Sequence, residues 1–109
     1  MLTSSFYISA YNPFSVSISL MSPPFFNGRK YKELAPTWEM LSLYKKFQNK
    51  LIYTHEYDKI LSDLDPKKVF TDLGEHAILC CWCLKGKFCH RHLVAKWLEE
   101  NLNITIKEL

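Results

Sequence analysis

The sequence predicts a small α/β domain with three layers, in which helices flank a mixed or parallel sheet. Three observations favour this class. Residues near the N-terminus alternate with period two, the middle of the chain has apolar residues at helical spacing, and a nearly continuous apolar run precedes a last amphipathic segment. Because 109 residues suffice to bury one core, we expect a single domain over residues 1–109.

The two N-terminal strands are expected near residues 4–11 and 14–20. Aromatic and β-branched residues occupy alternate positions in both stretches, as is typical of strands. An Asn-Pro pair at 12–13 separates the strands, and Ser-Pro-Pro at 22–24 ends the second one.

Three helices are expected next, near 38–49, 54–64 and 66–73. Thr37 is a suitable N-cap for the first helix, while Asp65 and a proline begin the third, which stops before Gly74. The apolar face of the first helix consists of Trp38, Leu41, Tyr44, Phe47 and Leu51.

The C-terminal part combines a buried strand with a long helix. The run HAILCCWC at 76–83 is typical of a strand covered on both faces, which we place at 77–82. A helix near 89–100 follows, and ITIK at 104–107 is expected to form a short last strand. The helix should pack against strand 77–82 through Leu93, Val94, Trp97 and Leu98.

Charge and hydropathy exclude several classes of protein. The chain has 14 basic and 11 acidic residues, a net charge of +3, which falls short of a dedicated nucleic-acid binder. Residues 1–28 carry no charge, but they lack the basic start and unbroken apolar run of a signal peptide. No run approaches the length of a membrane span. We therefore expect a cytoplasmic protein without a membrane segment.

Four cysteines lie within ten residues: Cys80, Cys81, Cys83 and Cys89. A disulfide scaffold would spread its cysteines along the chain, whereas clustered cysteines are more often thiols, metal ligands or a reactive site.

The candidate reactive residues lie in the segment after the buried strand. A short basic loop leads from the strand into the last helix, whose first turn bears Cys89, His90 and Arg91. Ligands gather beyond the carboxyl ends of strands in α/β sheets, and a helix N-terminus there attracts anions. Arg91 offers a planar fork for phosphate or carboxylate, and Cys89 should have a lowered pKa. These three residues are the candidate catalytic residues.

Two other interpretations stay open. Cys89 can be an ordinary buried residue, with Arg91 covering Trp97 or pairing with a carboxylate. Alternatively, Cys80 and Cys83 could bind zinc together with Cys89 and a histidine. Because a strand points Cys80 and Cys83 to opposite faces, we expect no metal and no cofactor.

Further candidate ligand-binding residues are polar or basic residues in loops near the expected site: Ser19, Ser22, Arg29, Lys85 and Lys87. Such residues are ordinarily exposed to solvent in loops and bind no ligand.

The sequence also resembles a known family, domain-of-unknown-function family 488. The match rests on LCCWCLKGKFCHRHLVAKWL, which is similar to the family's C-terminal Cys-His-Arg signature, and on SPPFFNGRKYKELAPTWEML and DPKKVFTDLGEHAILC, which resemble a short bacterial and phage branch. It spans residues 14–109 and implies a three-layer α/β fold in the cytoplasm, without supplying a reaction. The sequence departs from the pattern of this family at two places. Relatives tend to carry an acidic residue at the position of Cys83, and they often carry an arginine at the end of the early strand, which this sequence lacks.

Two classes of function follow from these residues. The first is an enzyme, a Cys-dependent hydrolase or transferase that binds an anionic small molecule or a nucleic-acid phosphate. Cys89 would then be the nucleophile or base, His90 a proton carrier and Arg91 the anion clamp. The second is a non-enzymatic phage or bacterial protein that binds a host macromolecule through the aromatic segment 6–26.

Overall fold

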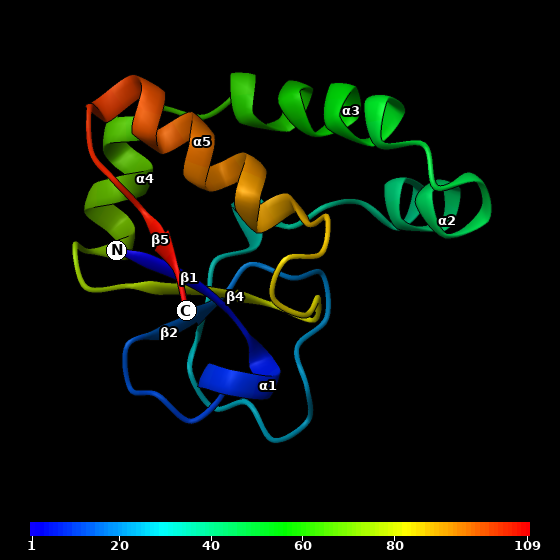
Figure 1. The fold of residues 1–109 in the computed structure, drawn as a ribbon. Helices are drawn as coiled ribbons and strands as arrows, with labels where there is room; N and C mark the ends of the chain where they lie inside the picture. Colours follow the sequence, from blue (N-terminus) through cyan, green and yellow to red (C-terminus); the bar gives the residue numbers. More distant parts are fainter.

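Five short strands form one parallel sheet in the computed structural model, which describes residues 1–109. Their order across the sheet is β3-β2-β4-β1-β5 (Figure 1). The strands are β1 (Leu2–Ser5), β2 (Ser15–Ser17), β3 (Arg29–Lys30), β4 (Ile78–Cys81) and β5 (Lys107–Glu108). The α/β prediction is confirmed, and the sheet is parallel rather than mixed.

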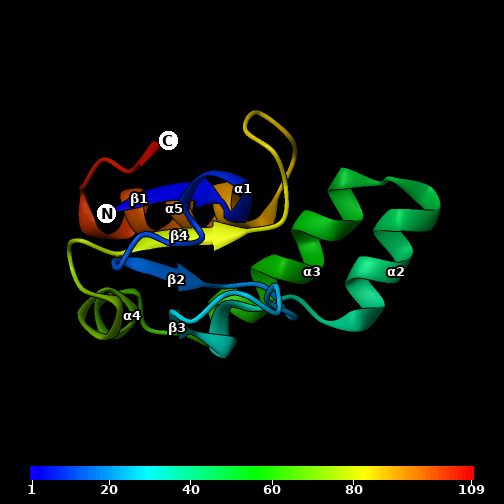
Figure 2. The ribbon, with the colours of Figure 1, turned by 90° about the horizontal axis from the view of Figure 1, so that it is seen from below.

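Helices lie on both sides of the sheet. They are α1 (Phe6–Ser9), α2 (Trp38–Phe47), α3 (Lys50–Ser62), α4 (Pro66–Leu73) and α5 (His90–Leu102), with a 3-10 turn at Lys32–Leu34. Figures 1 and 2 show α1 on one side, and α3, α4 and α5 on the other. Helix α2 packs against α3 and projects to the side. No helix has both the length and the apolar character that crossing a bilayer requires.

Strand β4 separates two apolar clusters. The larger cluster contains Leu79 together with side chains of α3, α4 and α5, such as Tyr57 and Leu98. The smaller one contains Ile78 and Cys80 with apolar residues of α1 and the loop that follows β2. Because neighbouring residues of a strand point to opposite faces, both faces of β4 are covered, as the apolar run predicted.

The predicted starts of the first and third helices are confirmed, whereas the second helix, predicted from residue 54, begins at Lys50 because Asn49 caps it. Thr37 accepts a hydrogen bond from the backbone N–H of Met40, and Asp65 accepts one from that of Lys67. Gly74, with φ of 88°, ends α4. Helix α5 contacts β1 and β4 as expected.

The strand predicted at 4–11 is wrong beyond Ser5. Ser5 accepts a hydrogen bond from the backbone N–H of Tyr7 and caps the short helix α1. Phe6 and Ala10, four residues apart, are buried, whereas Ile8 is exposed. Phe6 and Ala10 fit the spacing of a helix as well as that of a strand, whereas Ile8 fits the strand alone, and the cap at Ser5 favours the helix.

Other boundaries also differ from prediction. Strand β2 is limited to three residues, β3 was not predicted, and the last strand lies at 107–108 rather than 104–107. The expected apolar face of the first helix is largely exposed at Trp38 and Phe47. Helix α2 projects from the body, so few side chains are available to cover that face.

Candidate functional site

The candidate site lies where the loops after β2 and β4 meet the start of α5. From β2 the chain continues to β3 on one edge of the sheet, whereas from β4 it continues to β5 on the other edge. Two neighbouring parallel strands whose connections diverge leave a crevice at their carboxyl ends, which is the usual place for ligands in α/β sheets.

A cavity of about 300 Å³ fills this crevice. Eleven of its 14 lining residues are hydrophobic, so most of its wall is apolar. Its aromatic walls come from α2, α3 and the loop after β4: Trp38, Tyr44, Tyr53, Trp82 and Phe88. Ser19 and His90 are its polar residues, and three cysteines, counted among the hydrophobic ones, add thiol groups. A cavity of this composition suits a ligand with a flat apolar part.

Cys89 and His90 form a pair at the start of α5. Cys89 is the N-cap residue of the helix, and no side chain caps the helix at this end. The Nε2 atom of His90 lies 2.7 Å from the carbonyl oxygen of Ile18, and its Nδ1 atom lies 3.6 Å from Cys89 Sγ. Because the carbonyl can only accept, Nε2 carries the proton, which leaves Nδ1 of the neutral ring to accept from Cys89. Burial lowers the pKa of His90 to about 4, so the ring is neutral at pH 7.

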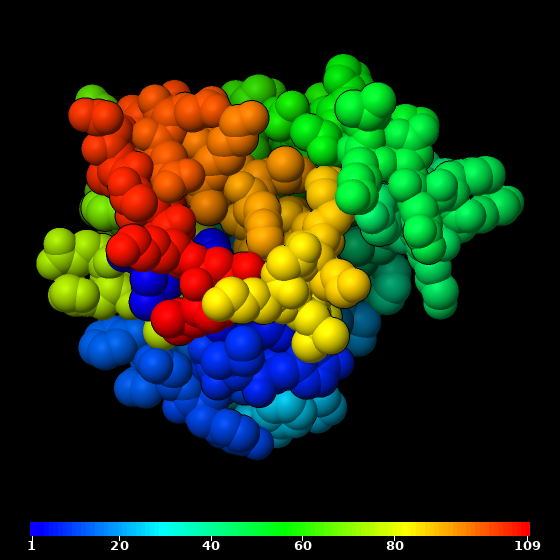
Figure 3. Space-filling model, in the orientation of Figure 1, coloured from blue at the N-terminus to red at the C-terminus, as the bar shows by residue number.

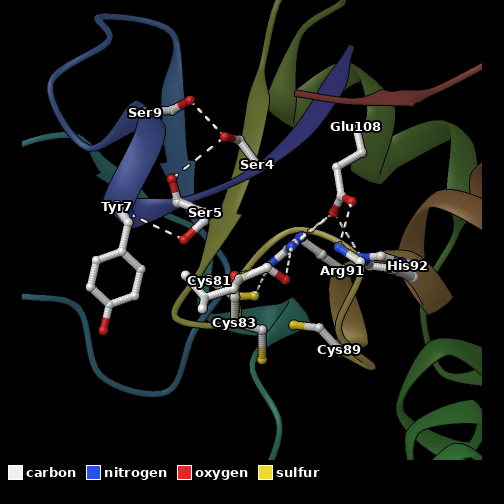
Figure 4. Close-up of polar contacts among 12 residues, drawn as sticks. Ser4, Ser5, Tyr7, Ser9, Cys81, Cys83, Cys89, Arg91, His92 and Glu108 are labelled. Carbon is white, nitrogen blue, oxygen red and sulfur yellow. Dashed lines mark hydrogen bonds and ion pairs between the residues drawn. The ribbon is translucent and has the colours of Figure 1, made fainter.

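Arg91 is fully buried behind this pair. Its Nε donates to Glu108 Oε1 at 2.9 Å, and its Nη1 donates to Cys81 Sγ and to the Cys83 carbonyl oxygen, both at 2.7 Å. Its Nη2 donates to the Leu84 carbonyl oxygen at 3.1 Å. Figure 4 shows the guanidinium between Glu108 and Cys81. These contacts tie the loop after β4 to the C-terminal strand.

Glu108 connects three parts of the chain. Besides Arg91, its Oε2 atom accepts from the backbone N–H of Gly86 at 3.2 Å. The Nε2 atom of His92 lies 2.8 Å from Oε1, without the alignment of a hydrogen bond. Figure 3 shows the loop that contains Gly86 against the C-terminal residues on the molecular surface. Neither Glu108 nor its contacts follow from the sequence pattern, because β5 is two residues long.

Three thiols gather beside the pair. The sulfur atoms of Cys81, Cys83 and Cys89 all lie within 4.8 Å of one another (Figure 4). Contacts with the Cys81 and Cys89 sulfur atoms lower the pKa of Cys83 to about 3. Contact with Cys83, together with burial, raises that of Cys81 to about 11. Cys83 is therefore the most acidic thiol of the cluster, with the Arg91 guanidinium alongside.

The lowered pKa expected for Cys89 is wrong. Hydrogen bonds with Cys81 and Cys83, together with burial, hold the pKa of Cys89 well above its ordinary value. The low-pKa thiol is Cys83, two residues beyond β4. The sequence offered a signal for this cluster, because the apolar run 76–83 contains Cys81 and Cys83 two residues apart, a spacing that places strand residues on one face. In the structure β4 ends at Cys81, and Cys83 lies in the loop that follows.

The remaining predicted residues are dispersed. Ser19 lines the cavity, while the Ser22 hydroxyl donates to Ser17 Oγ at 2.7 Å. Arg29 donates to backbone carbonyl oxygens at the end of α4, away from the cavity. Lys85 and Lys87 are exposed in the loop between β4 and α5 and do not line the cavity.

Comparison with known proteins identifies the family. A family model described as the active DUF488-N3 subclade matches residues 25–102, more than half of the chain. The chain belongs to the DUF488 family. The match includes β4, the thiol cluster and all of α5, whereas Ile18, Ser19 and Glu108 of this DUF488 protein's candidate site lie outside it. Neither the curated proteins nor the solved structures contain a match.

Proposed function

We propose that this DUF488 protein is a Cys-dependent hydrolase or transferase whose nucleophile is Cys89. The observation that carries the proposal is the pair formed by Cys89 Sγ and His90 Nδ1, 3.6 Å apart at the wall of the cavity. A nucleophile next to a base, with the base oriented by a third group, is the general arrangement of covalent catalysis. Here the Ile18 carbonyl oxygen is the orienting group.

The proposed step transfers one proton and replaces one bond of the substrate by a bond to sulfur. The thiol proton of Cys89 passes to His90 Nδ1 while Sγ bonds to an acyl carbon or a phosphorus atom of the substrate. The leaving group departs with its bonding electrons and takes the proton from His90. Water or a second acceptor then releases the group from Cys89, which distinguishes a hydrolase from a transferase.

The cavity and the helix start support an anionic substrate with an aromatic part, such as a nucleotide or a nucleic-acid end. Aromatic walls stack well on a flat base. The N-terminus of α5, with no side-chain cap, presents backbone N–H groups and a partial positive charge to an anion. Lys85 and Lys87 add positive charge in the adjoining loop. In this proposal Arg91 positions the thiols and the loop, since its donors already contact protein atoms.

Hydrolysis of p-nitrophenyl acetate and p-nitrophenyl phosphate tests the proposal. We expect Cys89→Ser to abolish turnover and His90→Gln to lower it about 100-fold, the usual contribution of a positioned base. Because Cys83 is the more exposed thiol, the adduct is sought in Cys83→Ser, where mass spectrometry should find an acetyl group on Cys89. Cys80→Ser is the matched control, because Cys80 belongs to the cluster on the other face of β4. Full turnover in Cys89→Ser, or no acetyl group on Cys89 in Cys83→Ser, would contradict the assignment.

A second candidate function, binding of a host protein, is favoured by exposed aromatic side chains around α1. The side chains of Tyr7, Tyr11, Phe14, Phe25 and Trp82 are all at least 42 % exposed. Aromatic residues are enriched in protein interfaces. A partner that co-purifies with Cys89→Ser but not with Tyr11→Ser would support binding, whereas the reverse pattern would favour the enzyme.

We also propose that the protein is cytoplasmic. All four cysteines are free thiols, three of them close together, and such thiols stay reduced in the cytosol. Expression in an oxidising compartment should produce a disulfide within the cluster, which non-reducing peptide mapping would detect.

A further inference from the structure

We propose that Cys81, Cys83 and Cys89 together bind one Zn²⁺ ion. Their sulfur atoms lie within 4.8 Å of one another, and all three are free thiols. Thiolate sulfur is a preferred ligand of zinc. No acidic side chain belongs to the cluster, so its donors are soft and favour zinc over magnesium or calcium.

The fold brings the three thiols together from one continuous segment. Cys81 ends β4, Cys83 lies two residues later on the same side, and Cys89 is the N-cap residue of α5. Figure 4 shows the three sulfur atoms close together beside Arg91. Cys81 and Cys89 are buried and set in secondary structure, while Cys83 is partly exposed in the loop, where it can adjust.

The distances fit a zinc site with small adjustments. A Zn–S bond of about 2.3 Å and tetrahedral angles place two sulfur atoms about 3.8 Å apart. The sulfur atoms therefore need to approach by at most about 1 Å, which small side-chain rotations at the three cysteines can provide. All three residues line the cavity, so the fourth position of the ion faces it. Three protein ligands with one open position are typical of zinc sites that accept water or a small ligand.

Arg91 supplies the outer contact that such a site requires. Its Nη1 donates to Cys81 Sγ at 2.7 Å, while Glu108 and the Cys83 and Leu84 carbonyl oxygens hold its other bonds. Hydrogen bonds to metal-bound ligands orient them and tune the site. Three thiolates and Zn²⁺ carry a net charge of −1, which the adjacent guanidinium offsets.

The proposed zinc ligands differ from the set that the sequence suggested, which paired Cys80 with Cys83. Cys80 lies in the cluster with α1, where its thiol contacts the Ile78 carbonyl oxygen at 3.6 Å. The proposed set uses Cys81 in place of Cys80. Cys81 ends β4 and Cys83 lies in the loop beyond it, so the alternation of side chains along a strand does not separate their sulfur atoms.

This inference does not rest on the proposed function. A bound ion would occupy Cys89 Sγ, so zinc and a covalent substrate would compete for that thiol. Metal uptake is measured without substrate, and esterase activity is measured with a chelator present. Failure of one proposal therefore leaves the other untouched.

Metal uptake by the full chain tests the site. Reduced protein, stripped with a chelator, is dialysed against Zn²⁺ and analysed for metal, and we expect about one ion per chain. Cys83→Ser should weaken binding at least about tenfold, since a thiolate ligand is lost. Cys80→Ser should bind as the wild type does. Less than half an ion per chain, or equal weakening in Cys80→Ser, would overturn the proposal.

A cobalt spectrum provides a second, variant-free test. Co²⁺ adopts zinc sites and shows an intense sulfur-to-cobalt charge-transfer band whose strength grows with the number of thiolates. Wild-type protein titrated with Co²⁺ should show this band at the intensity of three thiolates, and added Zn²⁺ should remove it. A spectrum without the band would overturn the site, even if Cys83→Ser fails to fold.

Discussion

The two faces of β4 place neighbouring cysteines in different surroundings. Cys80 and Cys81 are equally buried, at 0 % and 1 % exposed. Cys80 packs among Phe6, Phe26 and Ile78, and burial raises its pKa. Cys81 accepts a hydrogen bond from Arg91 and lies beside two other thiols.

The difference shows that burial alone does not decide the role of a cysteine. On the face toward α1, the thiol fills space as a small apolar group. On the face toward α5, a buried guanidinium supplies a donor and a charge, which allows a thiolate to exist away from water. Arg91 is therefore the residue that distinguishes the two faces.

Removing Arg91 should produce the largest effect. Arg91→Ala leaves Glu108 without its main partner and frees two backbone carbonyl oxygens. We expect the free energy of unfolding to fall by about 3–5 kcal/mol, the cost of breaking a buried ion pair from one side. Urea denaturation followed by circular dichroism measures it.

Two variants sharpen the comparison. Cys80→Ala, on the opposite face, should cost about 1 kcal/mol, since it removes a small packed group. Replacing both Arg91 and Glu108 by leucine should recover part of the loss, because no charge is then left unpaired. If Arg91→Ala costs no more than Cys80→Ala, the two faces are energetically alike and the distinction fails.

A smaller effect is expected from the titration of His90. Its pKa is about 4 in the folded protein and 6.5 as the ordinary value. The unfolded chain binds the proton more readily, so the free energy of unfolding should fall as pH drops from 6.5 toward 4. The free energy of unfolding should fall by at most about 1.4 kcal/mol per pH unit, or by about 3 kcal/mol over the whole range.

Carboxylates also titrate at acidic pH, so comparison of the wild type with His90→Gln is needed to isolate the contribution of His90. The variant should lose the extra slope between pH 6.5 and 4, measured by urea denaturation of metal-free protein. His76→Gln is the control, because His76 is exposed at the surface. Identical slopes for wild type and His90→Gln would mean that the imidazole is not buried in neutral form.

Much of the architecture could be predicted because local signals were consistent. Thr37, Asp65 and Gly74 each act through their immediate neighbours, and the caps they form are those expected. The apolar run at 76–83 is long enough to identify a covered strand. Helix α1 could not be distinguished from a strand, since apolar residues at Phe6, Ile8 and Ala10 alternate as in a strand while Phe6 and Ala10 also have helical spacing.

The candidate site was predictable in location but not in detail. The position of Cys89 and His90 at the start of α5 follows from strand, loop and helix order. The role of Arg91 depends on Glu108, which arrives from the far end of the chain, 17 residues later. The order of thiol pKa values depends on which sulfur atoms contact one another, and the sequence alone does not determine these contacts.

The smallest effect, and the most direct test of the two faces, is the order in which iodoacetamide labels the thiols. Cys83 is partly exposed with a pKa near 3, so it should react first, at least about tenfold faster than buried Cys89. Its rate should stay nearly constant between about pH 6 and 8, whereas that of an ordinary thiol, with a pKa of about 8.5, rises steeply there. Cys80 should stay unlabelled in the folded protein and serves as the internal control.

Peptide mapping by mass spectrometry over a pH series decides the order. A rate for Cys83 that rises tenfold per pH unit would show that no thiolate is held in the cluster, and the face toward α5 would then differ from the face toward α1 in packing alone.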